Sequence, residues 1–280
     1  MPLNSSCIAL LVLGNLGEAG ALSAKSLNAT GIKKICVVAD RNGKNWLSKS
    51  GLIDEKLELC FHENFEMQTV INNLSTNQNY VNFQSERFIR LMILKWMLIL
   101  DIFKIHSQIT NCVYSDLDVI WRKSPIKEIE FLNKSKKCFL IQDDTTLDGK
   151  RIFFCPGIMI WKNTPNSNDA LTSILEYQHE RNKNGNLLAD DKALNEWLKF
   201  DERILLLDKL PTQKYVIGHR FLWMIMNRKG FNFANVICFH GNYIIGKERK
   251  YAILKGASLN VNSVFRLYYA LIYIKFKLFR

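Results

Sequence analysis

Residues 114–121 read Tyr-Ser-Asp-Leu-Asp-Val-Ile-Trp and place two carboxylates, Asp116 and Asp118, in an otherwise apolar stretch. Residues 110–119 are predicted to form a strand that carries both aspartates at its end. On an extended backbone alternate side chains point to one side, so the two carboxylates could share a hard divalent cation. Unpaired carboxylates are costly in apolar surroundings, and a metal would offset that cost. The competing interpretation is a solvated turn, because a DxD triplet often occurs by chance.

Two mainly apolar runs near the start of the chain predict how the fold begins. Residues 7–13 and 34–40 read as strands, and residues 20–30 between them can form a short helix. Continuous apolar strands joined by a helix are typical of a parallel sheet that is covered on both faces. Ligands of such sheets bind beyond the carboxyl ends of the strands, where Asp116 and Asp118 are expected to lie.

Residues 85–104 predict one long helix that begins at Ser85 as its N-cap, with Glu86 in the first turn. The segment is apolar nearly all round and about as long as a membrane span. Besides Glu86, five charged residues interrupt it: Arg87, Arg90, Lys95, Asp101 and Lys104. We therefore expect a buried helix that carries cations towards an anionic group.

The rest of the chain alternates between strand and helix patterns. Strands are predicted at residues 137–141, 152–161, 204–207 and 236–239, and helices at residues 170–180 and 190–199. This alternation predicts an α/β fold with a mixed sheet. With 280 residues, 48% of them hydrophobic, and no linker or repeat, one domain is the default.

The cysteines and the N-terminus indicate the expected location. Seven cysteines are scattered without CxxC or CxH spacing, which argues against a disulfide framework and favours a reducing, cytoplasmic location. The first residues lack a basic region before the apolar run, so we expect a first strand and not a signal peptide.

The net charge of +12 predicts attraction to anions, and it is concentrated in residues 247–280, which hold eight basic residues against one acidic residue. Nucleic acid is not the expected partner, because no aromatic-basic repeat or known module accompanies the charge. Residues 256–280 are predicted to be a basic, aromatic tail that follows a single catalytic domain at residues 1–255. The tail suits an anionic membrane surface, which would make the protein peripheral at the inner face. Packing on the domain is the alternative.

The segment 114–121, followed by Pro125, resembles the DxD region of the GT-A nucleotide-diphospho-sugar transferases, and of the retaining glycosyltransferase families 77 and 8 in particular. Other landmarks agree in order over residues 7–250. They are Gly14-Asn15, Asp40, Phe88-Ile89-Arg90-Leu91 with Lys95, Cys155-Pro156-Gly157, Asp190-Asp191-Lys192-Ala193-Leu194-Asn195, and Phe239-His240-Gly241-Asn242 with Gly246-Lys247. The resemblance implies an α/β, Rossmann-like GT-A fold with a mixed, mainly parallel central sheet.

The resemblance also implies a metal and a nucleotide-sugar donor. Asp116, Asp118 and His240 would bind Mn²⁺ or Mg²⁺, and imidazole among carboxylates is more typical of Mn²⁺. By itself, His240 reads more readily as a core histidine. The donor, expected to be a UDP-sugar, would be contacted by Gly14, Asn15, Asp40, Arg90, Lys95, Asp116, Gly157, Gly241 and Lys247. For Lys95, an ion pair or a surface position is an equal alternative.

Two departures from the family pattern concern catalysis and the sugar pocket. Asp191 stands where the family has Gln, so it is a candidate nucleophile, with Asp190 as its catalytic neighbour. The alternative is that both are acids favoured by the start of a helix. Cys155 replaces Asn and removes an amide from the sugar pocket, so the sequence does not identify the sugar.

The predicted function is metal-dependent transfer of a sugar, with retention of configuration, from a nucleoside diphosphate sugar to a glycan or lipid-linked acceptor. Three alternatives stay open at this point: a metal-dependent phosphoesterase or nuclease, a non-catalytic polyanion-binding protein, and an inactive transferase relative that acts as a scaffold.

Overall fold

The computed structural model describes residues 2–49, 53–74, 85–145, 152–200, 202–242, 244, 247–259 and 264–278. The strands of its main sheet are β1 (Ser6–Val12), β2 (Lys34–Ala39), β3 (Glu58–Phe61), β4 (Asn111–Ser115), β6 (Phe139–Asp143), β7 (Phe154–Lys162) and β8 (Leu207–Leu210). Their order across the sheet is β3-β2-β1-β4-β7-β6-β8. Four strand pairs are parallel, while β7 runs antiparallel to β4 and to β6. The predicted mixed, mainly parallel sheet is confirmed.

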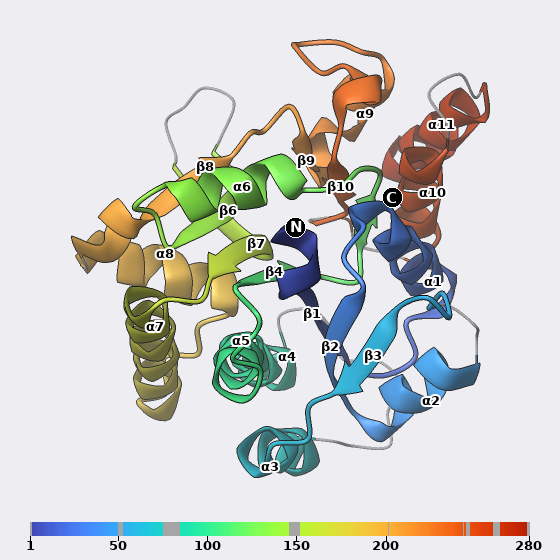
Figure 1. Cartoon of the computed structure of the whole chain (residues 1–280). Coiled ribbons are helices and arrows are strands. Elements are labelled where there is room, and N and C mark those ends of the chain that lie inside the picture. Colours follow the sequence, from blue (N-terminus) through green and yellow to red (C-terminus); the bar gives the residue numbers. More distant parts are fainter. Residues whose placement is uncertain are drawn as a thin grey trace.

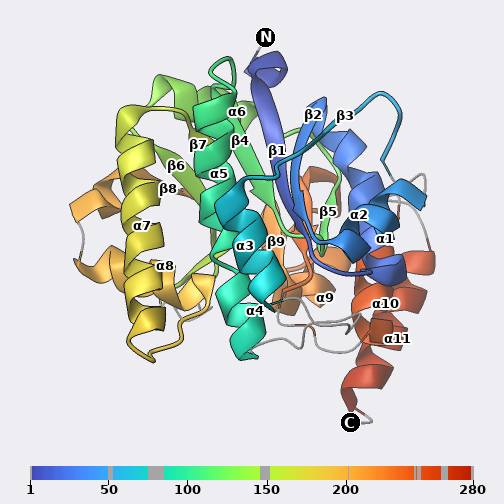
Figure 2. The same cartoon turned by 90° about the horizontal axis from the view of Figure 1, so that it is seen from below.

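The helices are α1 (Gly17–Ser26), α2 (Arg41–Lys49), α3 (Phe65–Leu74), α4 (Glu86–Leu91), α5 (Leu94–Ile105), α6 (Ile126–Lys134), α7 (Pro165–Lys183), α8 (Asp190–Phe200), α9 (Phe221–Ile225), α10 (Lys247–Ser258) and α11 (Phe265–Leu278). Helices α3, α4, α5, α7 and α8 cover one face of the sheet, and α2 and α6 lie over the other (Figures 1 and 2). Because both faces are covered, β1 and β2 are buried along nearly their whole length. The continuous apolar runs predicted this arrangement.

A second, three-stranded sheet extends the fold beyond β4, with β5 (Val119–Trp121) and β9 (Tyr215–Ile217) on either side of β10 (Cys238–His240). Helices α9, α10 and α11 pack beside it around a separate core that includes Phe221 and Phe239 (Figure 1). Strand β10 brings the C-terminal third of the chain against the segment that follows β4.

The prediction of one continuous helix at residues 85–104 is wrong, because the structure has two helices there. Ser85 does cap a helix, because its side-chain oxygen accepts a hydrogen bond from the Phe88 backbone N–H. Helix α4 ends at Leu91, and turns with short-range bonds, such as Lys95 N–H to the Met92 carbonyl, separate it from α5. Residues 86–105 contain no proline or glycine that would mark this break. The break therefore depends on packing.

Two other predicted elements differ from the structure. Residues 204–207 were predicted as a strand, but Glu202–Leu206 is a 3₁₀ helix and β8 begins only at Leu207. Other 3₁₀ segments within the described residues lie at Pro2–Ser5, Leu27–Thr30, Gly218–Arg220 and Phe233–Asn235. The helix predicted at residues 170–180 is longer, because Thr164 caps it and Pro165 occupies its first turn.

The predicted tail at residues 256–280 is described at 256–259 and 264–278. Helix α10 runs across position 255, and α11 packs against α10 with Ala270 and Tyr273 buried. On the other side of α11, Val264, Phe265 and Leu271 are exposed. Among the described helices, none combines the length and apolarity needed to span a membrane.

Helix α5 allows a test of the core. Replacing Leu98, which is fully buried, with Ala should lower the free energy of unfolding by about 2–5 kcal/mol, since the substitution leaves a cavity. Replacing Ile105, which is 59% exposed at the end of the same helix, with Ala should cost much less. Urea denaturation of both variants provides the measurement. Equal losses would contradict the burial of α5 described above.

Candidate active site

The segment Asp116–Asp118 forms a turn between two strands. Strand β4 ends at Ser115, and the Val119 backbone N–H donates to the Asp116 carbonyl at 3.3 Å before β5 begins. The prediction that both aspartates lie on an extended strand is therefore wrong. The turn is fixed from two sides, because Asp116 N–H donates to the Gly157 carbonyl and Gly241 N–H donates to the Asp118 carbonyl, both at 2.8 Å.

This turn brings Asp116 and Asp118 together with His240 at the end of β10. The imidazole Nε2 lies 3.1 Å from Asp118 Oδ1 and 3.8 Å from Asp116 Oδ2. One atom from each of the three residues lies within 4.8 Å of the others, which is a spacing that suits a shared metal ion. The three predicted metal ligands thus meet, although more than a hundred residues separate His240 from the aspartates.

Gln142, which the sequence analysis missed, orients the histidine. Its side-chain Nε2 donates to the Tyr215 carbonyl at 3.4 Å, so its Oε1 faces His240 Nδ1 at 2.7 Å. A carbonyl oxygen only accepts, so His240 Nδ1 carries the proton and Nε2 is the atom turned towards the carboxylates. Metal-binding histidines are commonly oriented in this way by a group on the other nitrogen.

Gly157 leaves room for this cluster. A Cβ at this position would lie 2.0 Å from His240 Cε1 and 2.7 Å from Asp116 Oδ2. No other amino acid fits without moving the histidine or the carboxylate. The donor atoms and the space around them therefore fit a divalent cation held by two carboxylates and one imidazole.

Lys95 is buried under the cluster, with 1% of its surface exposed. Its ammonium forms an ion pair with Asp190, lies 3.5 Å from Asp116 Oδ1 and donates to the Pro156 carbonyl at 3.0 Å. Burial alone would lower the pKa of Lys95, but Asp116 and Asp190 outweigh it and raise the pKa above its ordinary value. The ion pair that was an alternative to a donor contact for Lys95 is present in the structure.

Arg90 forms its ion pair outside this cluster. Arg90 pairs with Glu86 one turn earlier on α4, at 2.8 Å. Lys247 begins α10 and is exposed, whereas Lys250, one turn later, reaches Asp118 Oδ2 at 2.7 Å. Lys250 was not singled out from the sequence, although it belongs to the basic run that was. Gly246 lies outside the described residues.

The charges in the cluster perturb one another. Burial would raise the pKa of Asp118, but Lys250 and His240 hold it well below its usual range. Burial would lower the pKa of His240, yet Asp118 and Cys155 raise it well above its ordinary value. Burial raises the pKa of Asp116, with Lys95 and His240 opposing it. The buried carboxylates and their basic neighbours thus interact strongly within a small volume.

Asp190 and Asp191 begin α8 but differ in their surroundings. Asp190 is buried and paired with Lys95, while Asp191 is half-buried and accepts a hydrogen bond from the Lys192 backbone N–H at 2.8 Å. Burial and the neighbouring Asp190 raise the pKa of Asp191. Cys155, on β7, lies beside the other nitrogen of the histidine, with its sulfur 3.8 Å from His240 Nδ1.

The predicted donor residues Gly14, Asn15 and Asp40 lie at the ends of β1 and β2. Asp40 Oδ1 accepts from the backbone N–H of Gly14 at 2.9 Å and of Gly43 at 2.6 Å, so it holds the two loops together. Gly14 has a φ of +87°, a conformation that glycine adopts without strain. Asn15 accepts from Gly17 N–H and shapes the start of α1.

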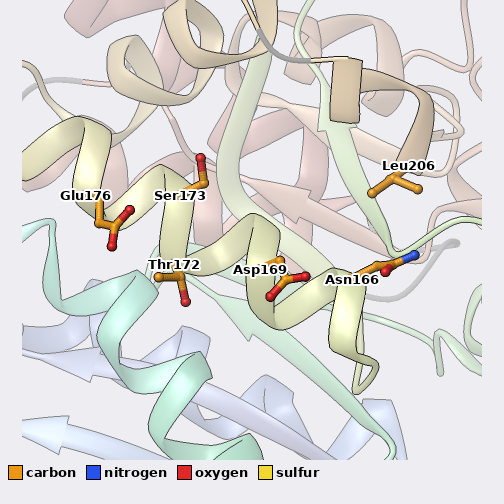
Figure 3. Close-up of a pocket in the computed structure, with 6 residues that line it drawn as sticks. All are labelled: Asn166, Asp169, Thr172, Ser173, Glu176 and Leu206. Carbon is orange, nitrogen blue, oxygen red and sulfur yellow. The ribbon is translucent and has the colours of Figure 1, made fainter.

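A separate hollow of about 550 Å³ lies along α7 (Figure 3). It is lined by Asn166, Asp169, Thr172, Ser173, Glu176 and Leu206. Its two carboxylates and lack of a cationic lining residue do not suit a diphosphate. The hollow is therefore not the expected donor site.

Comparison with known proteins decides the family. The sequence model for nucleotide-diphospho-sugar transferases matches residues 53–254, which span the Asp116–Asp118 turn, Lys95, Asp190 and His240. The chain belongs to this family. Membership places the protein among the glycosyltransferases, in agreement with the predicted resemblance. A search among curated protein sequences finds no match.

Solved structures agree on the GT-A fold. Mouse xyloside xylosyltransferase 1 matches with a TM-score of 0.53 and 12% identity, over 85% of this chain and 98% of that one. The glycosyltransferase GlyE of Streptococcus pneumoniae matches with a TM-score of 0.55 and 11% identity, over 95% of this chain and 64% of that one. The galactosyltransferase LgtC matches with a TM-score of 0.52 and 10% identity, over 93% and 99%.

Gly157 provides a test of the transferase's candidate metal site. Gly157→Ala should weaken Mn²⁺ binding by about tenfold or more, because the added methyl group displaces His240 or Asp116. Gly185→Ala is the control: its φ of +78° also strains a side chain, but nothing lies within 4 Å. Isothermal titration with Mn²⁺ measures both. Wild-type affinity in Gly157→Ala would contradict a cation held at this point.

Proposed function

We propose that this transferase moves a sugar from a nucleoside diphosphate sugar, with UDP as the expected nucleotide, to a glycan or lipid-linked acceptor, with retention of configuration. The observation that supports it best is the meeting of Asp116, Asp118 and His240 beside a glycine whose Cβ would fill the same space. A divalent cation bound there, with Mn²⁺ favoured by the imidazole, would offset charge on the leaving diphosphate.

The surrounding residues would prepare this site before the donor binds. Gln142 keeps His240 Nε2 facing the carboxylates, and Lys95 keeps Asp116 in place from below. Lys250 would move from Asp118 towards a phosphate oxygen of the donor, because a lysine is a compact cation on a flexible stem. Gly14, Asn15 and Asp40 would contact the nucleotide, and Gly157 and Gly241 would allow its diphosphate to approach the backbone. Arg90 and Lys247 keep their predicted donor roles within the proposal.

We assign the nucleophile role to Asp191 in preference to Asp190. The carboxylate of Asp190 is engaged by the buried Lys95, so it positions the lysine and the start of α8. Asp191 follows it on the same helix, is half-buried and forms no ion pair among the described contacts. A carboxylate near the anomeric carbon would displace the nucleoside diphosphate and form a covalent glycosyl intermediate. The acceptor hydroxyl would then displace the carboxylate, with net retention of configuration.

Helix α11 supports association with a membrane surface in the cytoplasm. Apolar side chains cover its outer side: Val264, Phe265, Leu267, Tyr268 and Leu271 are all more than half exposed. The exposed Lys275 lies on the same helix, whereas the guanidinium of Arg266 packs over the Phe233 ring. An exposed apolar face with a nearby cation suits an anionic bilayer, where a lipid-linked acceptor would also be found.

A screen of donor hydrolysis and transfer across nucleotide sugars tests the proposed activity. Turnover should require Mn²⁺ or Mg²⁺, stop with EDTA and fall about 100-fold or more in Asp118→Asn, which removes one metal ligand. Asp169→Asn, an exposed aspartate on α7, is the control. Absence of metal-dependent turnover with every nucleotide sugar would reject the transferase, and release of phosphate from simple phosphoesters would favour a phosphoesterase.

The role of Asp191 has its own test. Asp191→Asn should lower kcat at least ~100-fold, corresponding to about 2.7 kcal/mol in the barrier, while leaving donor binding nearly unchanged. Glu196→Gln, on the part of α8 that faces Arg181, is the control. Single-turnover kinetics with the active donor separate binding from chemistry. Unchanged turnover in Asp191→Asn would reject the nucleophile role. Asp190 and Asp191 would then be two acids that are favoured by the start of α8.

A further inference from the structure

We propose that Cys36, His62 and His106 form a second metal site, which binds a zinc-like ion and is independent of the transferase cluster. One ligand atom from each of the three residues lies within 4.8 Å of the others. Cys36 comes from β2, His62 follows β3, and His106 caps the end of α5. The three segments meet on the face of the sheet that α3 and α5 cover (Figure 2).

The orientation of His62 is the observation that points to a ligand. Its Nδ1 lies 2.7 Å from Asp101 Oδ2, and Asp101 Oδ1 accepts a second bond from Asn64 Nδ2 at 3.1 Å. A carboxylate only accepts when ionised, so Nδ1 carries the proton and the lone pair is on Nε2. That Nε2 has no hydrogen-bond partner, and it is buried because His62 is only 5% exposed.

The arrangement of Asp101 and His62 matches a common feature of zinc sites. Histidines that bind zinc usually donate their other ring N–H to a carboxylate, which fixes the tautomer and makes the imidazole a better ligand. Leaving a buried nitrogen without a partner destabilises the folded state, and a metal bond would remove that penalty. His106 packs edge-on against His62, with ring centroids 5.4 Å apart, and stays half-exposed.

The donor set distinguishes this site from the one at Asp116. A thiolate and two imidazoles are soft and borderline ligands that favour Zn²⁺ over Mg²⁺ or Mn²⁺. Three protein ligands of this kind commonly take water as a fourth. Cys36 lies in β2, two strands away from β4, whose end carries Asp116. The bound ion would link β2, the segment after β3 and the end of α5, so its expected effect is on stability.

Titration of the full-length protein with Co²⁺ tests the site, because a bound thiolate gives Co²⁺ a charge-transfer absorption that carboxylates and imidazoles do not. We expect one equivalent with this absorption, unchanged in Asp118→Asn and absent in Cys36→Ser. His106→Gln should weaken binding at least ~10-fold. His179→Gln, an exposed histidine on α7, should bind as the wild type does. Zn²⁺ should displace Co²⁺ and raise the melting temperature of the wild type by more than that of His106→Gln at the same concentration.

His106→Gln keeps the test decisive if Cys36→Ser does not fold, since His106 is half-exposed and its loss disturbs the core least. The proposal is overturned if the wild type shows no thiolate absorption with Co²⁺, or if His106→Gln binds Co²⁺ and gains thermal stability from Zn²⁺ as the wild type does. Transferase activity plays no part in these measurements, so failure of the proposed function leaves their outcome unaffected.

Discussion

The buried ammonium of Lys95 is the interaction on which the site depends. An isolated charge in a protein interior costs several kcal/mol, and this one is compensated by Asp190, Asp116 and the Pro156 carbonyl. These partners belong to α8, the end of β4 and the start of β7. A single side chain of α5 therefore holds together three segments that are distant in sequence, and their relative positions set the shape of the cluster.

Close packing around the cluster also limits which residue can stand at Gly157 on β7. Its backbone accepts from Asp116 N–H at Gly157, and the absence of a side chain there leaves space between His240 and Asp116. The negative charge of Asp116 is balanced by Lys95, and that of Asp118 is balanced by Lys250. The site thus places carboxylates beside lysine side chains. A divalent cation would bind to the carboxylates, and a diphosphate would bind to that cation and the lysines.

The two clusters of metal-binding side chains use different chemistry on one sheet. Oxygen ligands gather where β4 ends, beside the predicted donor loops, and suit a hard ion that meets phosphate. The thiol of Cys36 and the imidazole of His62 lie in a buried region between β2 and α5. One cluster is therefore suited to chemistry and the other to holding helices against the sheet.

The sequence by itself determined the βαβ opening and the mixed sheet, and its resemblance to a known family singled out Asp116, Asp118 and His240. These follow from apolar runs and short motifs, which are local properties of the chain. Only the tertiary structure decided that Asp116 and Asp118 form a turn, that α4 and α5 are separate helices, that Gln142 and Lys250 join the cluster, and that Cys36 meets two histidines. Each of these depends on packing between segments far apart in the chain, and spacing along the sequence carries no record of such contacts.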